Sequence, residues 1–206
     1  MSTPRDPSDP AFWEAEWADD PGFDLGATSP PLLRALGELP IGRDAVVLGC
    51  GRGHEARALA RLGWPRVVGV DFAEAALREA REAEALDAPW EVRPRVEWRR
   101  QDLFTLGQSD GASFDLAVEH ACCIAIAPER RPEWARTVAA VLRPGGRLVA
   151  LLSTKPRTGG PPFELRRAEV EALLAAEGLS FERSEVPEDS IASRRGLEWL
   201  VVARRG

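Results

Sequence analysis

The sequence predicts an α/β fold, because β-branched runs alternate with helical segments along most of its 206 residues. The deciding segment is 44–73, DAVVLGCGRGHEARALARLGWPRVVGVDFA. In it, the β-branched run Asp44–Leu48 is followed by glycines at alternate positions and then by a helix rich in Ala, Arg and Leu. A second apolar run begins at Arg66 and stops at Asp71. This pattern is typical of a βαβ unit whose first turn lets a ligand approach bare backbone.

The spacing of the glycines favours one kind of nucleotide ligand. Gly49, Gly51 and Gly53 occupy the first, third and fifth positions of the turn. A dinucleotide turn needs its last glycine at the sixth position, where this chain has His54. The G-x-G-x-G spacing is instead associated with methyltransferases that bind S-adenosylmethionine, in which an acid such as Asp71 bridges the ribose hydroxyls. The motif alone leaves open a glycine-rich turn in an unrelated α/β protein.

Composition and charge limit the partners. A chain of 206 residues suits a single domain spanning 1–206. The net charge of -6 argues against a nucleic-acid partner, because phosphate contacts require clustered Lys and Arg. No apolar run reaches the length of a membrane span and the first dozen residues lack a signal-peptide core, so we expect no membrane association and a cytoplasmic location. Without a long apolar stripe or heptad, we expect a monomer.

The cysteines and histidines do not suggest a metal site. Cys50, Cys122 and Cys123 are too few and wrongly spaced for a disulfide framework or a zinc site. Neither His54 nor His120 has a second imidazole nearby in the sequence. We therefore expect no metal. The adjacent cysteines fit either as small core residues or as part of a pocket lining.

The N-terminal forty residues divide into two parts. Residues 1–10 contain three prolines and are expected to be disordered or loosely draped. In residues 11–40, Trp13 and Trp17 lie four positions apart on one helical face, which fits either a helix packed on the core or a lid over a cofactor. Leucines from Leu32 to Leu39 predict one more helix before the first strand.

The remaining elements continue the alternation of strands and helices. We expect strands at 96–100, 113–119, 147–153, 179–186 and 197–203, and helices at 74–86, 132–142 and 166–177. With the two strands of the glycine segment this makes seven strands and leaves no room for a second domain. The strand at 113–119 abuts the first strand at the switch point, so its carboxyl end must border the pocket. Asp102 either accepts from the adenine amine or caps the following turn.

Five motifs together carry a resemblance to a known family. They are FWEAEWADDPGFDLG from Phe12, VLGCGRG, APERRPEWA, LRPGGRLVALLS and GGPPF. With these motifs the chain resembles the thiopurine S-methyltransferase family, which includes bacterial thiol and metalloid methyltransferases and plant halide and thiol methyltransferases. The resemblance covers nearly the whole chain, from Phe12 to Arg205. LRPGG is common across methyltransferases, whereas the tryptophan segment and GGPPF are far more specific.

The resemblance implies a fold, a cofactor and a set of site residues. It implies a Rossmann-like, mostly parallel sheet of seven strands with helices on both faces, an antiparallel last strand and an N-terminal helical lid over 11–40. The implied methyl donor is S-adenosylmethionine, the product is S-adenosylhomocysteine and the acceptor is a small soft nucleophile, with a thiol favoured. The implied cofactor-binding residues are Trp13, Trp17, Gly49, Gly51, Gly53, Asp71, Phe72, Asp102, Leu103, Glu119 and His120. The implied substrate-binding residues are Phe23, Arg131 and Phe163, with a surface arginine at a helix start as the alternative for Arg131. Cys123 is a further substrate-binding candidate from the cysteine pair itself, with a small core residue as the alternative.

The chemistry of these residue types fits methyl transfer. The aromatic faces of Trp13, Trp17 and Phe23 can each stabilise a sulfonium cation by about 0.5–2 kcal/mol. An in-line displacement mainly requires that the nucleophile be close, aligned and desolvated, so a thiolate needs no strong base. His120 is the candidate catalytic base, because its pKa lies near working pH. A contact to the cofactor carboxylate and a structural imidazole at a strand end are the alternatives for His120.

Departures from the family pattern leave other acceptors open. The chain has no tyrosine, whereas halide and thiol methyltransferase relatives often have tyrosines at the positions of His120, Ser153 and Phe163. This difference disfavours a halide acceptor. Halide, metalloid, oxygen and nitrogen acceptors, and a non-catalytic regulator that binds S-adenosylmethionine, remain as alternatives. A dehydrogenase is disfavoured by His54, and a methyltransferase acting on amino groups of bases or proteins by the absence of an Asn/Asp-Pro-Pro-aromatic motif after the fourth strand.

Overall fold

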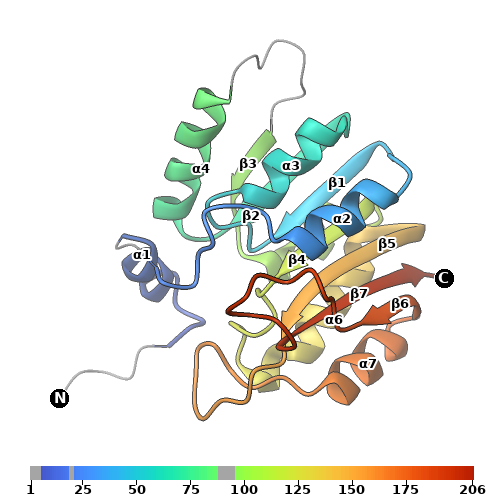
Figure 1. Ribbon diagram of the computed structural model, residues 1–206. Helices are drawn as coiled ribbons and strands as arrows, with labels where there is room; N and C mark the ends of the chain where they lie inside the picture. Colours follow the sequence, from blue (N-terminus) through green and yellow to red (C-terminus); the bar gives the residue numbers. More distant parts are fainter. Residues whose placement is uncertain (1–5, 19–20, 88–95) are drawn as a thin grey trace.

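The computed structural model describes residues 6–18, 21–87 and 96–206, and its centre is a seven-stranded sheet in the order β3-β2-β1-β4-β5-β7-β6 (Figure 1). The strands are β1 (Asp44–Leu48), β2 (Arg66–Asp71), β3 (Val96–Arg100), β4 (Phe114–His120), β5 (Leu142–Ser153), β6 (Leu179–Glu185) and β7 (Glu198–Arg205). Strands β1 to β5 pair in parallel, and β7 is antiparallel to both β5 and β6. The predicted mostly parallel sheet with an antiparallel last strand is therefore confirmed.

Helices cover both faces of the sheet, because its central strands are apolar on both sides. One face carries α2 (Pro30–Glu38), α3 (His54–Leu62) and α4 (Glu74–Leu86), and the other carries α6 (Arg131–Val141) and α7 (Arg167–Ala176). The short α5 (Leu106–Ser109) precedes β4. Alternate residues of β1 face opposite sides: Val46 and Leu48 pack in the cluster of α6 and α7, and Ala45 and Val47 in that of α2 and α3. Two separate cores therefore fix the plane of the sheet.

Two strand boundaries differ from the sequence prediction for a physical reason. β5 begins at Leu142 rather than at residue 147, because Leu142 pairs with Phe114 and an irregularity in the register accommodates the residues before Arg147. β7 continues to Arg205, because Arg205 pairs with Leu179 on β6. In both places cross-strand pairing extends a strand beyond its apolar run.

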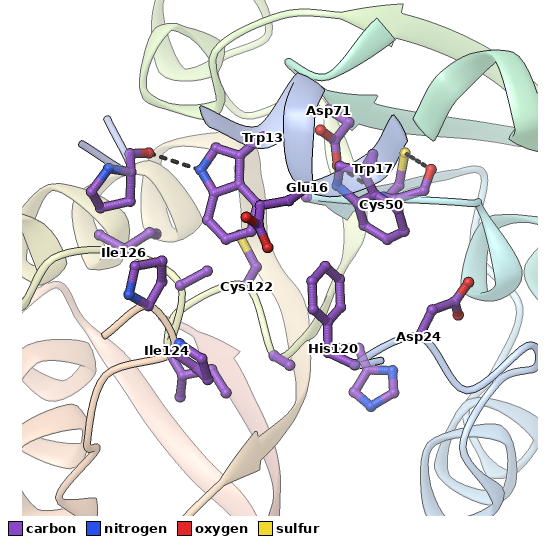
Figure 2. Close-up of a pocket in the computed structure, with 18 of the residues that line it drawn as sticks. Trp13, Glu16, Trp17, Asp24, Cys50, Asp71, His120, Cys122, Ile124 and Ile126 are labelled. Carbon is purple, nitrogen blue, oxygen red and sulfur yellow. Dashed lines mark hydrogen bonds between the residues drawn. The ribbon is translucent and has the colours of Figure 1, made fainter. Parts of the chain in front are cut away.

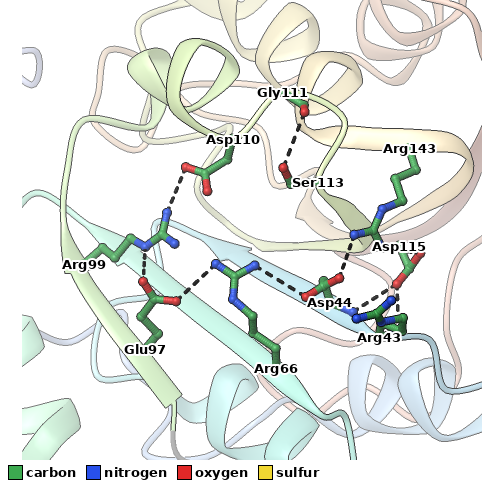
Figure 3. Close-up of polar contacts among 10 residues, drawn as sticks. All are labelled: Arg43, Asp44, Arg66, Glu97, Arg99, Asp110, Gly111, Ser113, Asp115 and Arg143. Atoms are coloured by element: carbon green, nitrogen blue, oxygen red, sulfur yellow. Dashed lines mark hydrogen bonds and ion pairs between the residues drawn. The ribbon is translucent and has the colours of Figure 1, made fainter.

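A chain of ion pairs runs along the amino-terminal edge of the sheet (Figure 3). Arg66 on β2 contacts Glu97 on β3 at 3.2 Å and Asp44 on β1 at 3.4 Å. Arg143 on β5 contacts Asp44 at 2.7 Å and Asp115 on β4 at 2.8 Å. Such partly exposed pairs each contribute about 0–1 kcal/mol, so their value lies in aligning neighbouring strands.

The helix α1 (Pro10–Ala18) stands apart from the sheet, beside the carboxyl ends of the strands (Figure 1). Its Glu14 accepts hydrogen bonds from the backbone N–H groups of Glu74 at 2.7 Å and Ala75 at 2.9 Å, at the start of α4. A carboxylate there satisfies free N–H groups and complements the helix dipole. Of the segment expected to be disordered, residues 1–5 lie outside the described residues and residues 6–9 form a turn closed by a backbone hydrogen bond.

Candidate active site

A cavity of about 500 Å³ lies at the carboxyl ends of the strands. Its walls come from the turns after β1 to β5, from α1 and the segment after it, and from the loop between β6 and β7. The volume falls in the range of small-molecule sites, and the position is the switch point where chain connections leave β1 and β4 in opposite directions. This edge of the sheet is opposite the ion pairs of Figure 3.

The turn after β1 presents bare backbone to the cavity. Gly49 and Gly51 have φ angles of +60° and +50°, a region that favours glycine. A Cβ atom at Gly49 would lie 2.6 Å from Sγ of Cys122, and one at Gly51 would lie 2.7 Å from the ring of Trp17. Side chains are therefore excluded at both positions. Gly53, the N-cap residue of α3, does not line the cavity, and a Cβ atom there would clash with the ring of Trp98.

Asp71, at the end of β2, holds this turn in place. Its Oδ2 accepts from the N–H of Gly51 at 2.9 Å and its Oδ1 accepts from the N–H of Ala73 at 2.9 Å. Burial raises the pKa of the Asp71 carboxyl, although the backbone N–H groups act in the opposite direction. The side chain also lines the cavity, and each carboxylate oxygen has a further lone pair for a ligand hydroxyl.

Residues that follow β2 and β3 form the rest of this side of the cavity. Phe72, Asp102 and Leu103 all line it. Oδ1 of Asp102 accepts from the N–H of Phe104 at 3.0 Å, so Asp102 caps the short helical turn after β3, one of the two predicted roles. Its contact with a ligand stays a prediction.

Aromatic side chains form another part of the lining, with Trp17 lying beside Asp71 and Cys50 (Figure 2). Trp13 and Trp17 of α1 and the following Phe23 line the cavity. The ring of Phe23 stands edge-on to Trp17, with centroids 5.1 Å apart, and edge-on to Trp13 at 6.5 Å. We call α1 together with residues 21–27 the lid.

Asp24 fastens the lid to the glycine turn. Its carboxylate lies 2.9 Å from Nη1 of Arg52 and 2.9 Å from Nε2 of His54. Nη2 of Arg57 lies 3.1 Å from Nδ1 of His54, and because arginine only donates, Nδ1 accepts and Nε2 donates to Asp24. Burial opposes ionisation of Asp24, but hydrogen bonds from His54, the backbone and Arg52 outweigh it and hold its pKa well below the usual range. His54 therefore helps to hold the lid on the glycine turn, a role that its position in the sequence did not indicate.

His120 lies at the end of β4, on the floor of the cavity (Figure 2). Its Nδ1 is 2.9 Å from Oε1 of Glu55, in the first turn of α3, and its Nε2 is 3.4 Å from Nη1 of Arg194. Because arginine only donates, Nε2 carries the lone pair and Nδ1–H donates to Glu55. Burial disfavours the imidazolium, yet the hydrogen bond and charge of Glu55 outweigh it and raise the pKa of His120. Arg194 also donates to the carbonyl of Phe23 at 2.8 Å and so links His120 to the lid.

The structure places the other predicted substrate-binding residues away from the cavity lining. Arg131 is 1% exposed, and its guanidinium contacts Glu169 at 3.2 Å and donates to the carbonyl of Glu164 at 2.7 Å. Cys123 is fully buried in the core. The ring of Phe163 packs over Gly160, whereas its neighbours 161 and 162 line the cavity. These placements correct the predictions for Arg131, Cys123 and Phe163, whose side chains are occupied by packing or ion pairing.

Glu119 lies just beneath the cavity rather than in its lining. It is fully buried, and its Oε1 accepts from the N–H of Cys123 at 2.7 Å. Burial raises the pKa of Glu119 to about 7. All three cysteines are free thiols, and burial raises the pKa of each. Within the described residues, no group of three or more His, Cys, Asp or Glu is arranged to hold a metal ion.

Comparison with known proteins identifies the family. Residues 8–204 match the family model described as Thiopurine S-methyltransferase (TPMT). The chain belongs to the thiopurine S-methyltransferase family. This family member is 33% identical over 197 residues to Thiocyanate methyltransferase 1 of Brassica oleracea, covering 91% of this chain and 82% of that protein. It is 35% identical over 180 residues to the Thiopurine S-methyltransferase of Azotobacter vinelandii, covering 81% and 82% of the two chains.

Solved structures of other methyltransferases share the fold of this chain. An S-adenosylmethionine-dependent methyltransferase from Mesorhizobium loti has a TM-score of 0.64 and 25% identity, covering 85% of this chain and 96% of that one. The 1,6-didemethyltoxoflavin-N1-methyltransferase of Burkholderia thailandensis, which holds S-adenosylhomocysteine, has a TM-score of 0.70 and 21% identity, covering 95% and 86%. The predicted family is confirmed, and the enzyme is an S-adenosylmethionine-dependent methyltransferase.

Proposed function

We propose that this enzyme methylates a small thiol, with His120 as the base that accepts the thiol proton. The observation that carries the proposal is the placement of His120, which lines the cavity at the end of β4 with Nδ1 held by Glu55 at 2.9 Å and Nε2 3.4 Å from Arg194. Relatives named for thiopurine and thiocyanate methylation support a sulfur acceptor. The absence of tyrosine leaves no phenolic group for this role.

The cavity lining fits S-adenosylmethionine, which when bound supplies an electrophilic methyl group on a cationic sulfonium. Gly49 and Gly51 line the cavity, and a Cβ atom at either position would clash with Cys122 or Trp17, so only glycine gives this turn its present shape. Asp71 offers carboxylate lone pairs for ribose hydroxyls, and Asp102 offers its carboxylate at the next strand end. Trp13 and the rest of the aromatic wall exclude water and present faces that favour a cation.

The residues around His120 handle the proton. In the proposed step the thiol S–H bond breaks, the proton moves to Nε2 and the electron pair stays on sulfur as the attacking thiolate. The resulting imidazolium keeps its hydrogen bond to Glu55, a buried carboxylate whose pKa is lowered by that hydrogen bond against the effect of burial. The contact of Nε2 with Arg194 is 3.4 Å, a length at which a hydrogen bond is weak and easily replaced by the thiol.

A methyl-transfer assay with a panel of acceptors tests this function. With labelled methyl donor we expect transfer to neutral thiols and none to iodide or alcohols. Replacing His120→Gln should slow transfer to a thiol of high pKa by roughly 10²-fold or more, the usual contribution of a positioned base. It should affect a thiol that is already ionised much less. Binding of S-adenosylhomocysteine without transfer to any thiol would instead support the non-catalytic regulator.

The remaining expectations stand as proposals. We propose one domain over 1–206 that acts as a cytoplasmic monomer on small molecules and not on nucleic acid. The net charge of -6 supports the exclusion of nucleic acid. Among the described residues, no helix has the length and apolar character needed to cross a membrane. Light scattering after gel filtration would measure the oligomeric state.

A further inference from the structure

We infer that the thiol acceptor carries a carboxylate of its own, bound by Lys155 and Arg157. The inference rests on the proposed thiol methylation and adds the class of substrate. Both residues line the cavity on the segment that follows β5. Lys155 is exposed and Arg157 is half-buried.

Charge is segregated along the cavity. The turns after β2 and β3 contribute the carboxylates of Asp71 and Asp102, on the side of the glycine turn. Beyond β4 in the sheet order, the lining contains Lys155 and Arg157 after β5 and Arg194 between β6 and β7. The lining contributed by the segments after β5 and between β6 and β7 therefore contains cations and no carboxylate.

Most cations of the lining are already neutralised by an acid. The pairs are Arg52 with Asp24, Arg130 with Glu133, and Arg194 with Glu198. Neither Lys155 nor Arg157 has an acidic side chain within 4.0 Å among the residues that the structure describes. Two positive charges thus face the cavity without an internal counter-charge, and an anionic ligand group supplies one.

Lys155 and Arg157 follow β5, the strand next to that of His120, so they can contact a part of the ligand other than its sulfur. His120 pairs with Leu151 in the sheet, and Lys155 and Arg157 follow Leu151 beyond the end of β5. Ile124 and Ile126 also line the cavity and offer an apolar surface to the body of a ligand. A thiol with a carboxylate a few bonds from sulfur has one group for His120 and one group for the two cations.

Matched acceptors test the inference. We would compare 3-mercaptopropionate with 3-mercapto-1-propanol, which have similar size and differ in charge. We expect kcat/KM to favour the carboxylate by roughly tenfold, the effect of one good charged contact, and to lose this preference in the double variant K155Q/R157Q. High salt should weaken the preference. R195Q removes one charge from an exposed arginine outside the lining and should keep the preference.

A second readout does not depend on turnover. Lys155 is the single lysine of the chain, so acetylation by an amine-reactive ester can be followed at one side chain by mass spectrometry, with the α-amino group as reference. With S-adenosylhomocysteine present, 3-(methylthio)propionate should slow acetylation of Lys155 severalfold. The neutral 3-(methylthio)-1-propanol should not. R157Q should reduce the protection, and R195Q should leave it intact.

The outcomes separate the two proposals. Equal kcat/KM for the two thiols, or equal protection of Lys155 by the two thioethers, would overturn the carboxylate site and leave thiol methylation standing. Protection by the carboxylate alone, with neither thiol methylated, would support the anion site and overturn the proposed function. Thermal melting of K155Q/R157Q checks that the variant is folded, which we expect because neither side chain has an ionic partner among the described residues.

Discussion

Nδ1 of His120, at the end of β4, lies 2.9 Å from Oε1 of Glu55, in the first turn of α3, although the two residues are 65 positions apart. The topology explains the contact, because β4 pairs with β1 and α3 begins in the turn after β1. The hydrogen bond fixes the tautomer of His120 and leaves Nε2 with a lone pair. Glu55 is thus a positioning residue for the candidate base.

Replacing Glu55→Gln should lower the pKa of His120, because the negative charge that raises it is lost. For a thiol of high pKa, we expect the ascending limb of kcat/KM against pH to move to lower pH and the plateau to fall, because a weaker base takes the thiol proton less readily. A thiol ionised throughout the pH range serves as the control. If its rate fell equally, Glu55 would have only a structural role.

The same pair should make stability depend on pH. The pKa of His120 is raised above its ordinary 6.5, so its contribution is complete below that value and is lost as pH rises through the folded-state pKa. The pKa of Glu55 is lowered from 4.5, so its contribution is lost as pH falls through that lowered pKa. The difference in unfolding free energy between wild type and Glu55→Gln should therefore peak between these limits. Urea titrations at several pH values measure it, with exposed Glu188→Gln as the unaffected control.

Replacing Asp24→Asn should loosen the lid, because a neutral amide would replace the carboxylate that binds Arg52 and His54. We expect S-adenosylhomocysteine to bind about tenfold more weakly, as the loss of a charged hydrogen bond usually costs. Calorimetry measures the affinity. Asp189→Asn breaks an exposed ion pair with Arg34 outside the cavity and should leave binding unchanged. Equal affinities of wild type, Asp24→Asn and Asp189→Asn would show that Asp24 does not help to close the lid.

Replacing Gly51→Ala should displace Trp17, since the new Cβ would lie 2.7 Å from its ring and the φ of +50° is strained for alanine. We expect weaker cofactor binding and a red-shifted, quencher-accessible tryptophan emission as the lid opens. Gly22→Ala is the matched control within the lid, because nothing lies within 4 Å of its added methyl. An unchanged spectrum for Gly51→Ala would show that Trp17 does not rest on this turn.

Replacing Arg131→Gln should destabilise the fold without changing acceptor preference. The guanidinium is buried and satisfies the carbonyl of Glu164 and the carboxylate of Glu169, so its loss should cost about 1–3 kcal/mol. Arg136→Gln, on the exposed side of the same helix, is the control. Denaturant unfolding gives the free energies. An altered ratio of kcat/KM for the two matched thiols would restore Arg131 to the substrate site.

Local sequence pattern determined most of the fold. The helix predicted over 74–86 is α4, Glu74–Leu86, and the strands of the glycine segment are β1 and β2 nearly residue for residue. These elements follow from periodicity, β-branching and glycine placement, which are properties of neighbouring residues. Boundaries that depend on pairing with a distant strand, such as the start of β5 at Leu142, could not be predicted from neighbouring residues.

The sequence by itself also predicted that Gly49, Gly51 and Asp71 lie together at one side of the cavity, because they belong to one continuous motif. Only the tertiary structure decided the other side. The tertiary structure paired His120 with Glu55 and buried Arg131 in the core. It also brought the loop after β5 and the loop between β6 and β7 together in the cavity lining. The reason is physical: a turn motif is set by adjacent residues, whereas the partner of a charged side chain is set by strand order and by the path of loops that carry no pattern of their own.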